Sequence, residues 1–418
     1  MEGVGDYEAA RQIMGELWQR VGERPNLQWL EPEIAAELLM RAGTLTGWLG
    51  SKNQVTEAQE TAKNLITEAI TIFESLSYGK KIAEAQIELA YCYWRQGAYD
   101  EARDVLKDAL SRLSTDSELK AKAILRMAIV ERGAARLNDA LHILTDNAPL
   151  FEKIKSHAIK GGYHNALAGV LEDLGISEQR QDYLDRAFIE YTAASYHFER
   201  ASHKPYRAHV QNNLGYLYFK VHRFKEAHIH LDSARRLLLN LKNYCSVAQV
   251  DETRARIYLA EKRYAEAEKA ACSSVRMLKA GGQQGILADA LITHGRTLAR
   301  LGFYDKAYSK LQRAIKAAHE SGAVNRAGEA ALAIIEELGD RLTLQRAQDT
   351  YAGSGLNAVR QYERNLIKEA LDRTEGRVTQ AARLLGTSHQ HLAYIIKHRH
   401  KGLLSARTPI KPRKKPAR

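Results

Sequence analysis

The chain has 418 residues, is 45% hydrophobic and holds only 7 prolines, so it is long enough for a large core and for more than one structural unit. It contains no apolar run of about 18 residues, and its acidic start lacks the basic segment of a signal peptide. The net charge is +12, and three scattered cysteines without a CxxC pair favour a reduced, cytoplasmic setting with the thiols as small core residues.

Residues 1–55 are expected to form an N-terminal helical cap. Alanine, leucine, glutamate, arginine and lysine dominate the composition, which favours an all-α fold. Helices are predicted over residues 7–21 and 33–49. Trp18, Trp29 and Trp48 should pack in this cap, because the end face of a helical array has no neighbouring repeat to cover it.

An internal repeat is predicted over residues 56–351. The stretch Ala83–Leu110 places a small residue, an aromatic, a glycine turn, a second aromatic and a second small residue in that order, and the order recurs along the chain. The period is shown by alanines expected on second helices, which lie 40 residues apart: Ala187, Ala227, Ala267 and Ala307. Three earlier alanines continue the series with spacings of 40 and 38 residues: Ala62, Ala102 and Ala140. A longer gap of 47 residues separates Ala140 from Ala187, and residues 179–186 should account for the excess.

These residues resemble the tetratricopeptide repeat, which has small residues where two helices cross closely and aromatic residues where helices wedge. The usual period of that family is about 34 residues, so a 40-residue period implies longer helices or longer linkers. HEAT and armadillo repeats, with periods of about 40–47 residues, are the structural alternative, although the order of residues favours the tetratricopeptide repeat. The resemblance implies a right-handed α-solenoid of about six to seven repeats.

The resemblance also implies a concave groove lined by the first helix of each hairpin. Asn212, Arg256 and Arg296 would lie on successive turns of it and suit an extended acidic peptide or protein segment. Ordinary solvated polar residues are an equal alternative at these positions. The full set of expected groove residues is Tyr91, Trp94, His209, Asn212, Tyr216, Phe219, Glu252, Arg256 and Arg296.

Almost all of the excess positive charge lies at the C-terminal end. Residues 352–357, AGSGLN, predict a flexible joint. Residues 356–418 hold 15 lysines and arginines against 4 acidic residues, so residues 1–355 hold 47 basic and 46 acidic groups. A basic module on a nearly neutral body is typical of a protein that contacts nucleic acid.

Within residues 358–404, the stretch Val378–Lys397 has the spacing of a helix-turn-helix. Ala381 and Ala382 allow close packing of a second helix, and Gly386 supplies a turn with positive φ. Ser388 is a natural N-cap for the second helix. The core positions of that helix follow at helical spacing: Leu392, Ile395 and Ile396.

The stretch Glu363–Ser388 resembles the Fis-type helix-turn-helix through its LIKEAL, T-x-G-x and TQAARLLG segments. In that family the second helix enters the major groove. Fis-type modules also work as dimers, and the apolar side of Leu366–Leu371 is the expected dimer face. The resemblance implies base contacts for Ser388, His389, Gln390 and His391, further contacts for Tyr394 and Lys397, and phosphate contacts for Thr379 and Gln380.

The sequence departs from the family along the middle of this helix, where Ala393–Ile396 replaces the usual basic residues. Positive charge follows the helix instead, and residues 405–418 are expected to be a disordered basic tail. Four nearby histidines lack cysteine or carboxylate partners, so no metal is expected. The expected phosphate contacts are Arg399, Lys401, Arg407, Lys411, Arg413, Lys414 and Lys415.

The sequence contains no phosphate-binding loop, dinucleotide fingerprint, metalloprotease motif or nucleophile elbow. We therefore expect no enzyme activity and no cofactor. The favoured function is a cytoplasmic bacterial transcriptional regulator that binds double-stranded DNA and holds a protein or peptide partner in its repeats. The alternative is a non-enzymatic scaffold whose basic C-terminus docks on RNA or on an acidic protein.

Overall fold

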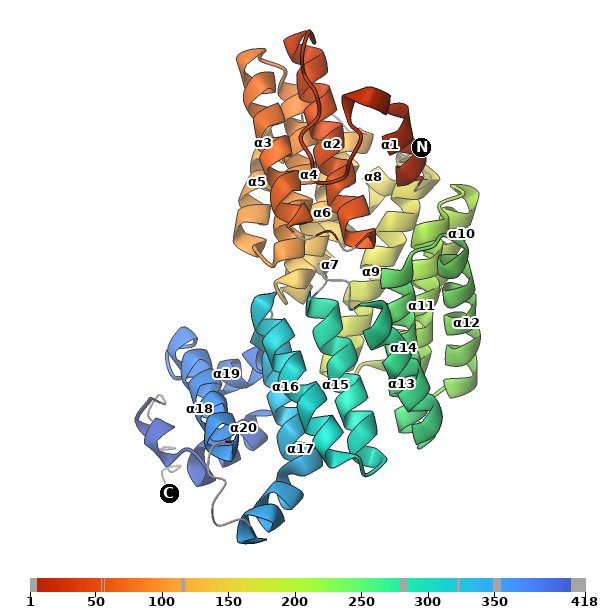
Figure 1. Ribbon diagram of the computed structural model, residues 1–418. Coiled ribbons are helices and arrows are strands. Elements are labelled where there is room, and N and C mark those ends of the chain that lie inside the picture. The colour runs from red at the N-terminus through yellow and green to blue at the C-terminus, as the bar shows by residue number, and fades with distance from the viewer. Residues whose placement is uncertain are drawn as a thin grey trace, which may run out of the picture. The chain divides into compact units, whose positions relative to one another are not determined.

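The computed structural model describes residues 6–53, 55, 57–113, 117–278, 284–321, 324–348 and 355–406, and all regular structure in these ranges is helical. Figure 1 shows the helices, most of them arranged as hairpins of neighbours in the chain. Contacts divide the chain into two units, Met1–Gln283 and Gln284–Arg418, which are described separately below. This is the all-α, repeat-based fold that the sequence predicts.

The first unit begins with α1 (Tyr7–Ile13) and a short 3-10 turn, η2 (Gly15–Leu17). The rest of it consists of helices that pack in consecutive pairs, with one additional short helix, α8. The pairs are α2 (Pro32–Lys52) with α3 (Ala58–Ser75), α4 (Gly79–Gln96) with α5 (Tyr99–Ser111), α6 (Glu118–Gly133) with α7 (Leu137–Asp146), α9 (His157–Glu178) with α10 (Gln181–Arg200), α11 (Lys204–Lys220) with α12 (Phe224–Asn240), and α13 (Tyr244–Ala260) with α14 (Tyr264–Met277).

The second unit starts with the hairpin α15 (Gln284–Arg300) and α16 (Tyr304–Glu320). Helix α17 (Val324–Gln348) packs against both helices of that hairpin. The predicted joint at residues 352–357 falls partly outside the described residues, and α18 begins within it at Gly355. The remaining elements are α18 (Gly355–Arg373), α19 (Val378–Leu384), α20 (His389–His398) and the 3-10 turn η3 (Lys401–Ala406).

The 40-residue period results from long helices joined by short turns. Helices α11, α12 and α13 each contain 17 residues. The turn before α11 and the turns after α11, α12 and α13 each include one residue in the left-handed region. In chain order these residues are Ser202 (φ 54°), His222 (φ 60°), Lys242 (φ 51°) and Lys262 (φ 61°). Such a residue just after a helix end satisfies the last carbonyl groups and reverses the chain. The extra length relative to a 34-residue repeat therefore lies in the helices, not in the linkers.

Small residues allow the two helices of a hairpin to cross closely, as the repeat pattern predicts. A Cβ added to Gly215 of α11 would lie 2.6 Å from the Leu231 side chain of α12. The same geometry recurs in α15, where a Cβ on Gly295 would lie 2.6 Å from the Leu311 side chain. Because real Cβ atoms do not approach other atoms so closely, glycine is needed at both crossings.

The long gap between Ala140 and Ala187 has a different origin from the one we predicted. We expected residues 179–186 to absorb it, but they form only a turn and the start of α10. The extra residues instead form α8 (Ala148–Lys153), which begins with a proline in its first turn, and they lengthen α9 to 22 residues. Leu150 and Phe151 of α8 are buried against α9, so the insertion adds to the core.

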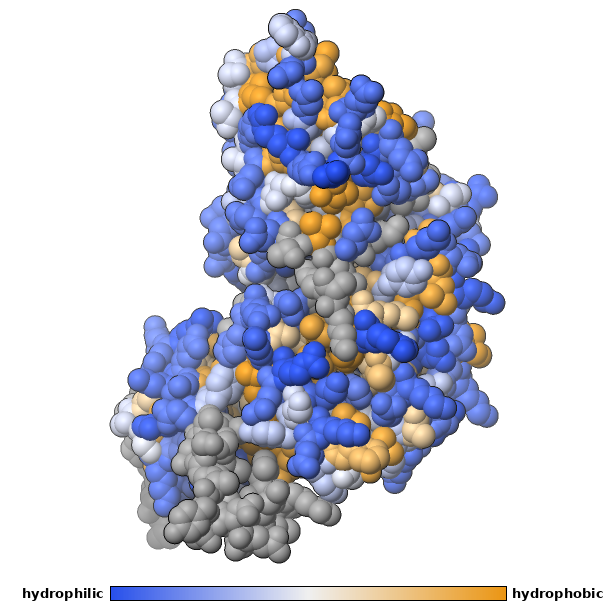
Figure 2. All heavy atoms as spheres, viewed as in Figure 1, coloured by the Kyte–Doolittle hydropathy of each residue, from blue (hydrophilic) through white to orange (hydrophobic). Residues whose placement is uncertain are grey.

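The predicted N-terminal cap is only partly correct. Trp18 is 2% exposed, and its indole nitrogen donates to the Glu23 carbonyl oxygen at 2.9 Å. Trp29 is 98% exposed, so our expectation that it packs is wrong. Helix α2 pairs with α3 as the first hairpin, and the visible face in Figure 2 shows apolar residues gathered over these two helices among charged ones.

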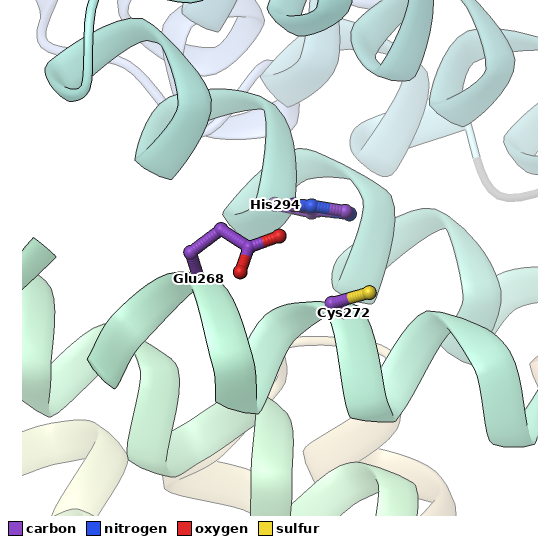
Figure 3. Close-up of side chains that lie close together, drawn as sticks. All are labelled: Glu268, Cys272 and His294. Carbon is purple, nitrogen blue, oxygen red and sulfur yellow. The ribbon is translucent and has the colours of Figure 1, made fainter. Parts of the chain in front are cut away.

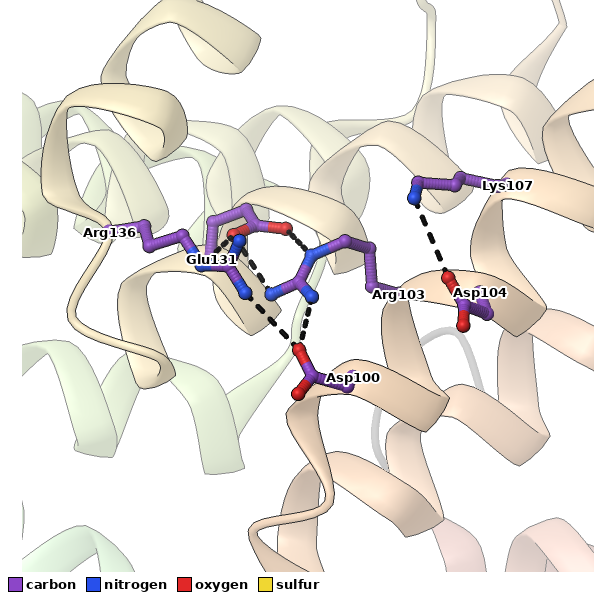
Figure 4. A network of polar contacts seen from close by, with 6 residues as sticks. All are labelled: Asp100, Arg103, Asp104, Lys107, Glu131 and Arg136. Atoms are coloured by element: carbon purple, nitrogen blue, oxygen red, sulfur yellow. Dashed lines mark hydrogen bonds and ion pairs between the residues drawn. The ribbon is translucent and has the colours of Figure 1, made fainter. Parts of the chain in front are cut away.

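An ion-pair network joins consecutive hairpins at α5 and α6 (Figure 4). The Arg103 guanidinium of α5 pairs with Glu131 of α6, whose side chain is only 6% exposed, and also with Asp100. Arg136, before α7, reaches Glu131 at 3.3 Å and Asp100 at 3.2 Å. The buried carboxylate of Glu131 is therefore balanced by two guanidinium groups.

Replacing Arg103 by alanine should destabilise the first unit. The change leaves Glu131 buried with Arg136 as its remaining partner, and we expect the free energy of unfolding to fall by roughly 3 kcal/mol. Urea unfolding followed by circular dichroism measures the shift. Lys107→Ala is the matched control, because the Lys107–Asp104 pair spans 3.5 Å between exposed side chains and should contribute less than about 0.5 kcal/mol. Equal midpoints for the two variants would contradict a dominant role for the buried pair.

Candidate functional site

The C-terminal helices form a compact helix-turn-helix with a core of its own. Helices α18, α19 and α20 and the turn η3 contribute apolar side chains that pack together. Ala381 and Ala382 of α19 are buried at 0% and 1% exposure, so α20 packs closely across them as predicted. The core consists of Ile367, Ala370, Leu371, Val378, Ala381, Ala382, Leu392, Ile395, Ile396 and Leu403.

The turn between α19 and α20 has the predicted chemistry. Gly386 has φ of 65°, a conformation that side-chain-bearing residues rarely adopt. The Ser388 hydroxyl accepts a hydrogen bond from the His391 backbone nitrogen at 3.1 Å, so it caps the N-terminus of α20. These two residues fix where α20 begins and the direction in which its first turn points.

All of the expected DNA-contacting residues that lie within the described ranges are exposed. On α20 the apolar residues face the core, and the polar ones face outward, with Tyr394 56% exposed. The tail residues Arg407, Lys411, Arg413, Lys414 and Lys415 lie outside the described residues. The exposed set is Thr379, Gln380, Ser388, His389, Gln390, His391, Tyr394, Lys397, Arg399 and Lys401.

Arg383 belongs to this surface, although sequence reasoning missed it. It lies one helical turn after Thr379 and Gln380 on α19 and is exposed like them. The signal was available in the sequence, because residues three or four apart share a helix face. Arg373 and Arg377, by contrast, pair with Glu369 and Glu375.

A buried pair joins Glu363 of α18 to His400, which follows α20. The His400 Nε2 atom lies 2.6 Å from Glu363 Oε2, and both residues are less than 10% exposed. The Arg399 guanidinium lies 3.7 Å from the other oxygen of Glu363. His400 and Arg399 are therefore tied to α18, whereas we expected Arg399 to act only on phosphate.

The apolar side of Leu366–Leu371 is used inside the second unit. Ile367, Ala370 and Leu371 belong to the module core, and Leu366 is 8% exposed. Leu366 lines a small crevice with Ala331 and Ile335 of α17, across which the module meets α17. The face on which we placed a dimer contact is thus already buried within the second unit, and a dimer stays a prediction that rests on the family resemblance.

The expected groove residues of the first unit fall into two groups. Tyr91 and Trp94 of α4 stack with ring centroids 5.2 Å apart, and Tyr206 connects this region to His209 of α11. Burial, with a smaller contribution from Arg95, lowers the pKa of His209 to about 4, so this ring is neutral near pH 7. Farther along α11, Tyr216 and Phe219 pack side by side below Asn212, with ring centroids 6.1 Å apart.

The charged groove residues are paired within the chain. Arg256 pairs with Glu252 one turn earlier on α13. In the second unit, Arg296 of α15 lies 3.3 Å from Glu336 of α17. The prediction that arginines on successive turns hold a partner carboxylate stays a prediction, and both side chains already contact carboxylates of this chain.

The three cysteines are free thiols. Burial raises the pKa of Cys92 to about 12 and that of Cys245 to about 11, so both are inert core residues as expected. Cys272 is exposed instead, one helical turn after Glu268 on α14 (Figure 3). The expectation of a small core residue is therefore wrong for Cys272.

Comparison with known proteins agrees with this geometry. Residues 358–397 match the family described as "Bacterial regulatory protein, Fis family". No curated protein matches the chain. Among solved structures, a Rap protein complexed with competence and sporulation factor is similar with a TM-score of 0.52 and 17% identity, over 89% of this chain and 100% of that one.

A second similar structure is a signal transduction ATPase with numerous domains and a tetratricopeptide repeat sensor, from Pyrococcus horikoshii. Its TM-score is 0.50 at 12% identity, over 77% of this chain and 55% of that chain. The chain is a tetratricopeptide-like repeat protein with a Fis-family helix-turn-helix. At such identities the solved structures show the fold alone, and they favour tetratricopeptide-like repeats over the HEAT and armadillo alternative. No helix in the described part of this repeat protein is long and apolar enough to cross a membrane.

Removing the buried His400 side chain should loosen the Fis-family module. In His400→Ala, Glu363 loses its closest partner, and an unsatisfied buried group costs roughly 1–3 kcal/mol. We expect amide hydrogen exchange in α18 and α20 to accelerate by about tenfold or more. His398→Ala is the control, because His398 is exposed and its ring lies tilted against that of Tyr394. If both variants exchange alike, the His400–Glu363 pair does not hold the module together.

Proposed function

We propose that this protein is a sequence-specific DNA-binding transcriptional regulator whose repeat helices bind a protein or peptide partner. The observation that carries the proposal is the Fis-family module: its apolar residues form a core, and its N-terminal α20 residues are all exposed. The concentration of positive charge in residues 356–418 supports the same function, because phosphate contacts supply much of the affinity for DNA. Such a role places the chain in the compartment that holds the genome.

In this proposal α20 enters the major groove with its first turn against the bases. Gln390 presents an amide that matches the donor and acceptor pair of adenine, and His389 and His391 flank it. Thr379, Gln380 and Arg383 of α19 contact phosphates beside the groove. Residues 405–418 add further positive charge along the backbone of the DNA.

The repeat helices supply the partner site in the proposal. The Rap structure that resembles this chain is a complex with competence and sporulation factor, so this fold accommodates a partner in that protein. The chain offers aromatic and charged side chains on first helices, among them Tyr91, Trp94 and Tyr216. In the proposal a partner bound there changes the affinity of the Fis-family module for DNA, through a coupling free energy between the two sites.

Two substitutions on α20 should separate base reading from phosphate binding. Gln390→Ala should weaken binding to the preferred duplex by about 1–3 kcal/mol and relax selectivity at one base pair. Lys397→Ala should weaken binding to every duplex alike and lower the slope of log affinity against log salt by about one. Fluorescence anisotropy with duplexes selected from a random pool measures both quantities.

The controls decide between the proposal and the scaffold alternative. Lys316→Ala alters an exposed lysine of α16, outside the module, and should leave DNA affinity unchanged. A chain lacking residues 356–418 should lose duplex binding. Retention of duplex binding by that chain, or a preference for RNA or an acidic protein over every duplex, would refute the proposed function.

A further inference from the structure

Aromatic rings from α1, α2, α4 and α11 meet inside the first unit. Trp48 of α2 is stacked between Tyr7 of α1 and Tyr91 of α4, with ring centroids 5.1 Å and 4.8 Å away. Trp94 continues the stack beyond Tyr91 at 5.2 Å, and Tyr206 of α11 meets Trp48 edge-on at 5.9 Å. We call Trp48, Tyr91, Trp94 and Tyr206 the ring platform.

The ring platform is built on long helices, whereas the helix that supplies Tyr7 is short. Helices α2, α4 and α11 have 17 or more residues each and pack in hairpins through buried residues. Helix α1 has only 7 residues, of which Tyr7 and Ala10 are partly buried against the core and none is fully buried. A helix so short is not stable by itself in water, so the contacts of its few inward-facing side chains hold it in place.

Two arginines flank the ring platform. The Arg126 guanidinium of α6 lies over the Tyr91 ring, 4.0 Å from its centroid, and the Arg95 guanidinium lies 5.6 Å from the same centroid. Arg95 also donates to the Tyr91 hydroxyl at 3.3 Å. Within the described ranges neither arginine forms an ion pair with a carboxylate, although the Glu88 carboxylate interacts with Arg126 electrostatically from farther away. An anionic ligand beside the rings would therefore give both arginines a closer partner.

The segment that covers the ring platform shows what chemistry fits there. Tyr7 stacks on Trp48 and lies close enough to Tyr206 to affect the pKa of that hydroxyl. It is flanked by Asp6 and Glu8, so the covering segment is an aromatic residue between two acids. Asp6 caps its own helix and Glu8 pairs with Arg11, which leaves the two platform arginines without a carboxylate from α1.

We propose that the ring platform, with Arg95 and Arg126, is a docking site for an acidic peptide segment that carries an aromatic residue. Tyr7 occupies the position of that residue until the partner displaces α1. This inference rests on the proposed function, because it takes the first helices of the repeats as the partner site. It goes further by stating the chemistry of the partner and by making α1 its internal competitor.

The test uses the full-length chain and a fluorescein-labelled synthetic peptide with the sequence of residues 5–14, GDYEAARQIM. In Tyr7→Ala the internal competitor is weakened, so the peptide should bind about tenfold more tightly than to the unaltered chain. A peptide with alanine in place of its tyrosine should bind about tenfold more weakly to Tyr7→Ala. Adding Arg126→Gln to Tyr7→Ala should weaken binding of the tyrosine peptide and reduce its salt dependence.

Tyr244→Ala is the matched control, since Tyr244 is 50% exposed on α13 of the same unit; it should bind the peptide like the unaltered chain. Saturating peptide should also accelerate amide exchange within residues 7–13 of the unaltered chain. Equal affinity of the unaltered chain and Tyr7→Ala, or equal binding of the two peptides, would overturn the proposal. Peptide binding and DNA binding are measured separately. A chain that failed to bind DNA would refute the proposed function without changing the peptide result, so the failures of the two proposals are distinguishable.

Discussion

The structure depends on how closely two helices approach each other within a hairpin. At Gly215 and Gly295 there is no room for a Cβ atom, because a leucine of the second helix fills the space. The alanines that face these crossings from the second helix, Ala227 and Ala307, are fully buried. Close backbone contact of this kind excludes water and fixes the position of each helix against its partner, so side chains at equivalent repeat positions face the same direction. The ion pairs between neighbouring repeats follow from that regularity.

Ion pairs between residues roughly one repeat apart complement the apolar crossings. In the first unit the Arg41 guanidinium lies 2.6 Å from Glu84, and that of Arg132 lies 2.7 Å from Asp173. Arg300 and Glu337 form such a pair in the second unit, at 2.9 Å. Because the polar groups of neighbouring repeats are used in this way, an arginine on a first helix contacts its own chain before any partner. Within the described ranges Arg95 and Arg126 are exceptions, because they lie beside the Tyr91 ring and form no ion pair with a carboxylate.

The sequence predicted the features that depend on local chemistry. Gly386, Ser388 and the buried alanines of α19 are where the pattern placed them, because turns, caps and close crossings each require particular residue types. Pairing across helices was not predictable. The spacing that placed Arg296 on a first helix contains no information about Glu336 of α17 as its partner. The pair of Arg256 with Glu252 is different, because the two residues lie four apart on one helix and the sequence already shows that spacing. Likewise, the sequence shows that the gap before Ala187 is longer than the others. It does not show that the extra residues form α8, since a short helix and a long loop can have the same number of residues.

The buried pair of Glu363 and His400 bears on where the Fis-family module of this chain ends. Similarity to the Fis family stops at residue 397, three residues before His400, and Leu403 of the module core lies farther still. A fragment that ends at residue 397 would keep nearly all of α20 but would leave the buried Glu363 carboxylate without its His400 partner. The smallest independent unit is therefore set by the last residue that satisfies a buried charge or fills the core, and here that limit lies inside η3.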